Sequence, residues 1–162
     1  MTPAGTLRIG IVSDTHDVLL AALHDALAGV DEILHAGDIA SAEALAEIRT
    51  IAPVIAVRGN MDERALADRL PEEEVLTRGG VRIALVHGHR LGHASVNDLA
   101  KRFEDRGVDL VVWGHIHEPV SELRNGVRYF NPGTAGGIGA PATCGILTIP
   151  EHDFTLEHIS LV

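Results

Sequence analysis

Short apolar runs of strand length recur along this chain, and each ends in a turn that carries Asp, Asn or His beside or near a glycine. The side chains at these ends are Asp14 and His16, Asp38, Asn60, His87, and His115 and His117. All of them offer an oxygen or nitrogen that can bind a divalent cation. Histidines scattered over a surface would not follow the ends of strands. The pattern therefore predicts a metal site, and we expect two metals in it.

The first sixty residues alternate predicted strands and helices. Apolar runs at 7–13, 32–36 and 54–57 are predicted strands, and the spacing of leucines predicts a helix over 18–28. A second helix is predicted to end near Arg49, with Ser41 as its N-cap because a hydroxyl there can accept a first-turn N–H. This alternation indicates a largely parallel sheet, and sites form in the loops at the carboxyl ends of such strands.

The remaining residues predict short strands and one further helix. Gly79-Gly80 and Asn125-Gly126 each lie between apolar runs and predict hairpins. The other predicted elements are a helix over 95–106 and strands over 74–77, 81–86, 109–113, 120–123, 127–130, 143–149 and 154–159. Two β-sheets packed on each other, with helices outside, accommodate this order. We see no repeat and no linker, and we expect residues 1–162 to form one domain.

Composition restricts the class of protein further. At 162 residues with 46% hydrophobic and only 3% aromatic residues, the chain can bury a sizeable core made of Leu, Ile, Val and Ala. No apolar run approaches the roughly 20 residues of a membrane span, and residues 1–6 lack the pattern of a signal peptide. Cys144 is the only cysteine, which excludes an internal disulfide and a thiolate cluster. We expect a cytoplasmic protein without a membrane partner.

The net charge of -10 bears on the partners. Affinity for nucleic acid comes mainly from Lys and Arg at backbone phosphates, so duplex nucleic acid is not an expected partner. A small phosphate ester remains compatible, because bound divalent cations would reverse the local potential. Homo-oligomer formation stays open.

The motifs differ in specificity. Asp14-x-His16 directs a carboxylate and an imidazole to one side of an extended segment, but this spacing and Gly37-Asp38 are each common. His115-x-His117 beside Gly114 is more specific. Four further histidines fit no pattern, and we assign them no function: His24, His35, His152 and His158.

Taken in order, the motifs resemble the signature of the calcineurin-like metallophosphoesterase superfamily, which runs D-x-H, G-D, G-N, H-G or G-H, and G-H-x-H. The matching segments are Asp14-Thr15-His16, Gly37-Asp38, Gly59-Asn60, His87-Gly88 and Gly114-His115-Ile116-His117. The resemblance extends from about Leu7 to Thr134. The small size and Asn131-Pro132-Gly133-Thr134 are similar to the compact bacterial and archaeal phosphodiesterase branch. The resemblance implies an α/β (α+β) fold, a four-layer αββα sandwich.

The resemblance also implies a dinuclear phosphodiesterase that hydrolyses small or nucleotide-like phosphodiesters with a metal-bridging hydroxide as nucleophile. The first metal would be held by Asp14, His16, Asp38 and His117. Asp38 would bridge, and the second metal would be completed by Asn60, His87 and His115. Oxygen and nitrogen ligands suit divalent transition metals. Manganese is our first expectation, and iron, zinc, cobalt and nickel are alternatives.

One position departs from the family pattern. Many members carry histidine after G-N, but here the residue is Met61. This matches the small phosphodiesterase branch, which commonly has cysteine or another non-histidine residue there. The obvious proton donor is therefore missing. Asp62 and His89 are the candidates for a catalytic role, against the alternative that each only supports a ligand. Arg58 and Arg90 flank ligand segments and are candidates for substrate contact beside Asn60, against the alternative of solvated surface arginines.

A second reading of the fold is a metal-poor scaffold. A trafficking subunit of eukaryotic coats shares this fold and binds partner proteins, and it is degenerate at several metal positions. This chain keeps all seven donors, which favours the enzyme.

Overall fold

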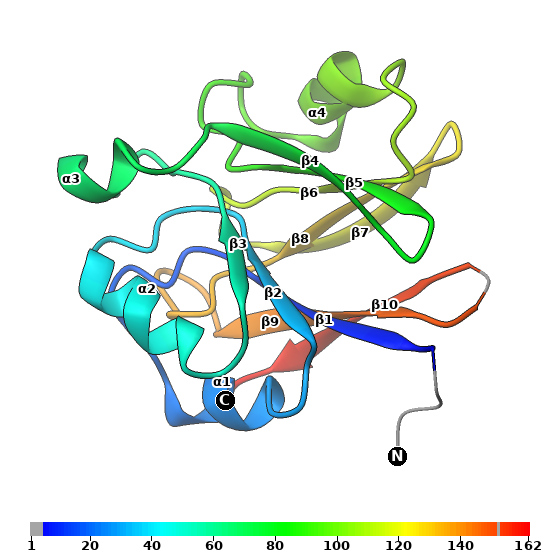
Figure 1. Ribbon diagram of the computed structural model, residues 1–162. Coiled ribbons are helices and arrows are strands. Elements are labelled where there is room, and N and C mark those ends of the chain that lie inside the picture. Colours follow the sequence, from blue (N-terminus) through cyan, green and yellow to red (C-terminus); the bar gives the residue numbers. More distant parts are fainter. Residues whose placement is uncertain (1–4, 152) are drawn as a thin grey trace.

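The computed structural model describes residues 5–151 and 153–162, which form two five-stranded sheets packed face to face (Figure 1). The first sheet has the order β10-β9-β1-β2-β3 and the second has the order β4-β5-β6-β8-β7. The strands of the first sheet are β1 (Leu7–Val12), β2 (Glu32–His35), β3 (Val54–Ala56), β9 (Thr143–Ile149) and β10 (Thr155–Ser160). Those of the second are β4 (Glu73–Arg78), β5 (Val81–Val86), β6 (Leu110–Val112), β7 (Pro119–Arg124) and β8 (Val127–Pro132).

Both sheets are mixed. In the first, β1 pairs in parallel with β2 and β2 with β3, while β9 joins β1 in antiparallel register. In the second, β5, β6 and β8 run parallel, and the hairpin strands β4 and β7 are antiparallel to their neighbours. The parallel strands of each sheet therefore end together, which collects their loops at one edge.

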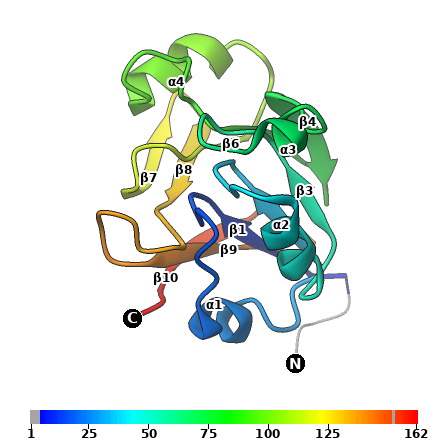
Figure 2. The same ribbon diagram turned by 90° about the vertical axis from the view of Figure 1, so that its left-hand side faces the viewer.

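The helices are α1 (Ala21–Ala26), α2 (Ala42–Arg49), α3 (Arg64–Ala67) and α4 (Val96–Phe103). Helices α1 and α2 cover the outer face of the first sheet and α4 that of the second, whereas the short α3 lies beside the edge of the sheets (Figures 1 and 2). Leu23 of α1 and Ile48 of α2 pack on the first sheet, and Phe103 of α4 packs on the second. The predicted αββα sandwich is thus confirmed.

Alternation along the strands supplies both faces of each sheet. Ile11 lies in the core between the sheets, whereas its neighbour Val12 faces the core beneath α1 and α2. On β2, Leu34 likewise lies in the core between the sheets, and Ile33 faces the core beneath the helices. Successive side chains of a strand point to opposite faces, so a continuous apolar run fills two cores at once. This explains why these runs are apolar at most positions instead of alternating strictly between apolar and polar residues.

Two helices differ from the predicted ranges at their ends, whereas α2 begins after its N-cap Ser41 and ends at Arg49 as predicted. The predicted helix over 18–28 is wrong at its start, because Leu20 is an extended N-cap and the preceding residues form the loop of the site. The helix predicted over 95–106 is α4, which begins after Ser95 with a reciprocal capping box to Asp98 and ends at Phe103. Helix α3 was not predicted, because four residues give no periodicity. No helix of the described residues is long and apolar enough to cross a membrane.

Candidate metal centre

The loops after β1, β2 and β6 carry most of the predicted ligands, and they adopt an unusual backbone. The φ angles are positive at Asp14 (54°), His16 (48°), Asp38 (59°), His115 (70°) and His117 (60°). Residues with a Cβ atom rarely occupy this region, and each such position costs of order 1–3 kcal/mol. Strain of this kind collects where side chains must be aimed precisely. Hydrogen bonds hold the loops together, including Asp14 N–H to Gly37 O (3.0 Å) and His16 N–H to Asp38 O (2.9 Å).

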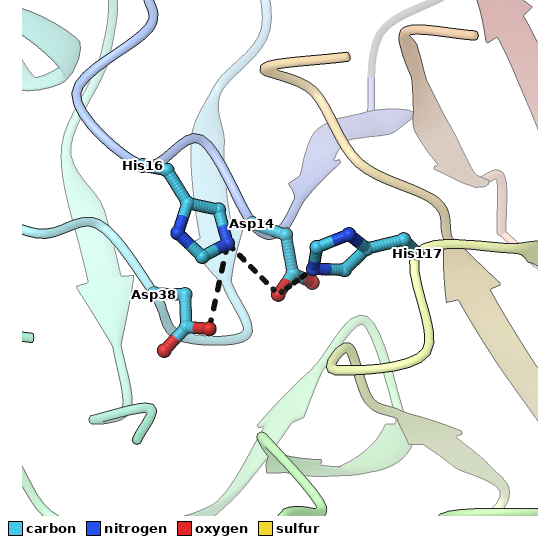
Figure 3. Close-up of side chains that lie close together, drawn as sticks. All are labelled: Asp14, His16, Asp38 and His117. Carbon is cyan, nitrogen blue, oxygen red and sulfur yellow. Dashed lines mark ion pairs between the residues drawn. The ribbon is translucent and has the colours of Figure 1, made fainter. Parts of the chain in front are cut away.

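Four of the predicted ligands converge in one tight cluster (Figure 3). Asp14, His16, Asp38 and His117 each contribute one ligand atom, and these atoms all lie within 4.8 Å of one another. Asp14 Oδ1 is 3.2 Å from His117 Nε2 and 3.7 Å from His16 Nε2. His16 Nε2 is also 3.5 Å from Asp38 Oδ2. These are the four residues that the family resemblance assigned to the first metal.

The hydrogen-bond state of this cluster fits a cation. Among the described residues, Asp14 Oδ1 and His16 Nε2 are buried atoms without a hydrogen-bond partner. His117 Nδ1 is 2.7 Å from Ile138 O, so Nδ1 must donate and the Nε2 lone pair faces Asp14. Leaving a buried carboxylate oxygen unpaired is costly, and a divalent ion would satisfy it together with the imidazole nitrogens. The donor set therefore fits a divalent metal.

The ligands assigned to the second metal lie beside this cluster in a looser arrangement. His87 is fully buried, and its Nδ1 donates to Ala36 O at 2.7 Å, which turns Nε2 inward. That Nε2 lies 3.0 Å from Asn60 Oδ1 and 3.3 Å from Asp38 Oδ2. The His115 ring lies 5.2 Å from the His87 ring between centroids, and its backbone N–H donates to Asp14 Oδ2. Within the described residues, His115 is not part of the tight four-residue cluster.

The carboxylates and imidazoles shift one another's pKa. Burial would raise the pKa of Asp14, but the imidazoles of His117 and His16 hold it well below its usual value. Burial also opposes ionisation of Asp38, yet His87 lowers the pKa of that carboxyl. Burial would lower the pKa of His87, but Asp38 and Asp14 raise it, and Asp14 raises the pKa of His117. The site thus keeps both carboxylates ionised and attracts positive charge, whether protons or a metal.

The pKa values of His89 and of His115, which the resemblance assigns to the second metal, are shifted in the opposite direction. Burial lowers the pKa of both, and the neighbouring His87 lowers it further. His89 lies 5.4 Å from His87 between ring centroids, and its Nδ1 is buried without a hydrogen-bond partner among the described residues. His89 is therefore a neutral imidazole near the cluster with one ring nitrogen uncommitted.

Asp62 is engaged by the backbone. One carboxylate oxygen accepts from Ala40 N–H at 2.8 Å and the other from Gly59 N–H at 2.7 Å. These contacts tie the loop after β2 to the loop after β3, and they favour the supporting role over the catalytic one. Met61 is 60% exposed, and its backbone N–H donates to Asp38 Oδ1. Its side chain can donate no proton.

Arg58 and Arg90 do not act as isolated surface cations. Arg58 Nη2 lies 3.1 Å and Arg90 Nη1 lies 2.6 Å from the same oxygen, Oε1 of Glu72. Glu72 could not be recognised from sequence patterns, because the three residues come from separate loops. Together with Asn60 and His89 they line a pocket of about 390 Å³ beside the cluster.

Several buried residues support the ligands and were missed in the sequence. Ser13 Oγ donates to Asp14 Oδ2 (2.6 Å), and Thr134 Oγ1 donates to Asp14 O (2.7 Å). Asn131 Nδ2 donates to Gly114 O and its Oδ1 accepts from Gly133 N–H. The available signal in the sequence is the Asn131-Pro132-Gly133-Thr134 segment, which contains two of these residues.

The four histidines without an assigned function do not share one environment. His24 lies on the surface near Glu47, and His158 stacks on Phe130 with ring centroids 4.4 Å apart. His152 lies outside the described residues. His35 is fully buried and hydrogen-bonds Gly37 N–H and Thr15 Oγ1 beneath the site. It therefore supports the loops without being one of the predicted ligands.

Comparison with known proteins agrees with this geometry. The profile of the calcineurin-like phosphoesterase superfamily domain matches residues 7–152. The chain belongs to that superfamily. A probable metallophosphoesterase of Methanothermobacter thermautotrophicus is 36% identical over 133 residues, which cover 79% of this chain and 77% of the relative.

Two further similarities point to different kinds of protein. A phosphodiesterase of Methanocaldococcus jannaschii is 32% identical over 169 residues, which cover 91% of this chain and 96% of the relative. A crystal structure of a Vps29 single mutant from Entamoeba histolytica has a TM-score of 0.84 at 26% identity, covering 96% of this chain and 93% of that one. The family therefore supports phosphoester hydrolysis, and the Vps29 likeness keeps the scaffold alternative in view.

Proposed function

We propose that this chain is a dinuclear phosphodiesterase that hydrolyses small or nucleotide-like phosphodiesters. The observation that carries the proposal is the convergence of the buried Asp14 and Asp38 with the half-buried His16 and His117, with two of their atoms left without a hydrogen-bond partner among the described residues. Membership in the phosphoesterase superfamily and the likeness to an archaeal phosphodiesterase support it.

The proposed ligands divide between two divalent transition metals, for which manganese is the first expectation. Asp14, His16, Asp38 and His117 would hold one, and Asp38, Asn60, His87 and His115 would hold the other. Such metals polarise a phosphate oxygen and lower the pKa of water toward neutrality. The protein's part is to orient the ligands. The His87 Nδ1 bond to Ala36 O and the His117 Nδ1 bond to Ile138 O present both Nε2 atoms inward.

The surroundings of the site favour diesters with good leaving groups. Met61 cannot protonate a departing oxygen, Asp62 is held by two backbone N–H groups, and the lowered pKa of His89 keeps it neutral near pH 7. Proton donation typically contributes about 10²–10⁴-fold to rate, most for leaving groups that depart as unstable anions. We therefore propose that aryl diesters are cleaved better than alkyl monoesters, and that the uncommitted Nδ1 of His89 orients the leaving oxygen.

A metal-poor interaction scaffold is the second candidate, because Vps29 has a closely similar fold. The seven donors in place on this chain count against it. Metal content separates the two, since a scaffold would bind little metal at these positions.

The test combines metal analysis with hydrolysis. Protein purified without chelator should contain divalent metal and should hydrolyse bis(4-nitrophenyl) phosphate with added Mn²⁺. Asp38→Ala should reduce turnover by more than about tenfold, equivalent to about 1.4 kcal/mol of barrier, because Asp38 is the ligand shared by both metals. Asp25→Ala, an exposed carboxylate on α1, is the matched control and should keep full activity. Protein without bound metal and without hydrolysis would contradict the enzyme proposal and leave the scaffold as the remaining candidate.

A further inference from the structure

The pocket beside the cluster shares a wall with the proposed metal site. Its volume is about 390 Å³, and its lining includes Asn60, His89, Arg58 and Arg90. Asn60 belongs to both, because its Oδ1 lies 3.0 Å from Nε2 of the buried His87. The volume falls in the range of small-molecule sites and exceeds what one phosphate group needs. A substrate whose scissile phosphate meets the ligands would therefore extend into this pocket.

The charged groups of the pocket are arranged to accept an anion. Two guanidinium groups share a single oxygen of Glu72, at 3.1 Å from Arg58 and 2.6 Å from Arg90, so two positive charges face one negative charge there. The pocket's other carboxylate, Asp62, accepts backbone N–H groups with both oxygens. The four charged side chains therefore balance in number, but the guanidinium groups keep free donors while both Asp62 oxygens are already hydrogen-bonded. The local balance is thus unlike that of the chain, whose net charge is -10.

Stability alone does not account for this arrangement. The Arg90 side chain is 70% exposed, and exposed ion pairs contribute only about 0–1 kcal/mol. What Glu72 does is hold in place two long side chains that enter from different loops, Arg58 after β3 and Arg90 after β5. A guanidinium has five N–H donors, and the contact with Glu72 uses one of those on Arg90. The others remain for a planar, two-point contact with phosphate oxygens.

We propose that this arginine pocket binds a second phosphate group of the substrate, so that the preferred substrates are phosphodiesters that carry a further phosphate. The inference rests on the proposed phosphodiesterase function and names its substrate class. Arg58 and Arg90 are the specificity-determining residues, and Glu72 is the residue that positions them.

A matched pair of substrates tests the proposal on the metal-loaded protein. The 4-nitrophenyl ester of thymidine 5'-phosphate and its 3'-phosphorylated analogue have the same leaving group and differ by one phosphate. The wild type should show a KM about tenfold lower for the phosphorylated substrate, the size expected of one charge-assisted contact. The quantity compared is the KM of the substrate without the 3'-phosphate divided by the KM of the phosphorylated substrate. Arg90→Gln should bring this ratio close to one, and Arg58→Gln should lower it. Arg82→Gln removes an exposed arginine at the opposite end of β5 and should keep the wild-type ratio.

A binding measurement is independent of turnover. Calorimetric titration of the metal-loaded wild type should give tighter binding of thymidine 3',5'-bisphosphate than of thymidine 5'-phosphate, and Arg90→Gln should remove the difference. Equal KM values and equal affinities in the wild type would overturn the proposal, as would equal ratios in Arg90→Gln and Arg82→Gln. Absence of hydrolysis of every diester, with the affinity difference intact, would reject the proposed hydrolysis and retain the phosphate pocket.

Discussion

His35 lies beneath the loops that carry Asp14 and Asp38, and its hydrogen bonds define its protonation. Gly37 N–H donates to Nδ1 at 3.1 Å, so the proton must be on Nε2, which donates to Thr15 Oγ1 at 3.1 Å. Complete burial lowers the pKa of His35 to about 4, although nearby carboxylates oppose the shift. A neutral imidazole is therefore part of the folded state.

This protonation state predicts a pH dependence of stability. In the unfolded chain His35 has an ordinary pKa near 6.5, so the unfolded state takes up a proton first as the pH falls. The free energy of unfolding should therefore decline from pH 6.5 toward pH 4, with His35 contributing up to about 3 kcal/mol to the loss. Urea unfolding in the presence of a chelator, repeated at several pH values, measures this decline. In His35→Asn this contribution should vanish, so the free energy of unfolding should fall less steeply with decreasing pH than in the wild type. Equal dependence on pH in the two proteins would show that His35 is not the cause of the decline.

At the scale of elements, the ends of β1 and β6 come so close that only glycine fits between them. A Cβ atom on Gly114 would overlap the Ser13 hydroxyl and lie 2.6 Å from Asp14 Oδ2. The Ser13 hydroxyl itself donates to that carboxylate. The glycine of the G-H-x-H motif is thus explained by close approach. Gly114 is not among the glycines with positive φ, so its backbone conformation alone does not require glycine.

Gly114→Ala should therefore displace Asp14 and weaken metal binding. Loss of contacts that orient a ligand typically costs about 10–100-fold in metal affinity, and we expect an effect of this size in a titration with Mn²⁺. Gly145→Ala is the control, because its added methyl meets the Phe130 ring in the core instead of the site. That variant should lose stability while keeping its metal affinity. If both variants lose affinity equally, general destabilisation is the cause.

The sequence predicted the strands and the candidate ligands because both follow from local patterns. An apolar run followed by Asp or His is visible without knowing the fold, and parallel strands place such ends together. The start of α1 could not be predicted, because residues 14–17 form a loop with positive φ angles that depend on contacts with 37–39. The sharing of Glu72 by Arg58 and Arg90 was also hidden, since it joins three loops.

At the scale of the whole molecule, the two sheets hold the site from opposite sides. Asp14, His16, Asp38 and Asn60 follow strands of the first sheet, whereas His87, His115 and His117 follow strands of the second. The His115 N–H bond to Asp14 Oδ2 crosses between them. A metal could therefore join the sheets, but the core between them is already filled by buried side chains such as Ile11, Leu85 and Leu147. Burying each such residue contributes about 1.5–3 kcal/mol.

Removal of bound divalent metal should consequently leave the protein folded. Cys144 on β9 provides the probe, because it is fully buried in the core beneath α1 and α2, and burial raises the pKa of its thiol to about 12. A thiol in this state reacts with Ellman's reagent at pH 8 only when the chain opens, since the thiolate is the reactive form. After treatment with chelator we expect a lower melting temperature, an unchanged far-ultraviolet circular dichroism spectrum, and a Cys144 reaction that stays far slower than in urea. Rapid reaction in chelator alone would mean that the metals, rather than the apolar core, hold the two sheets together.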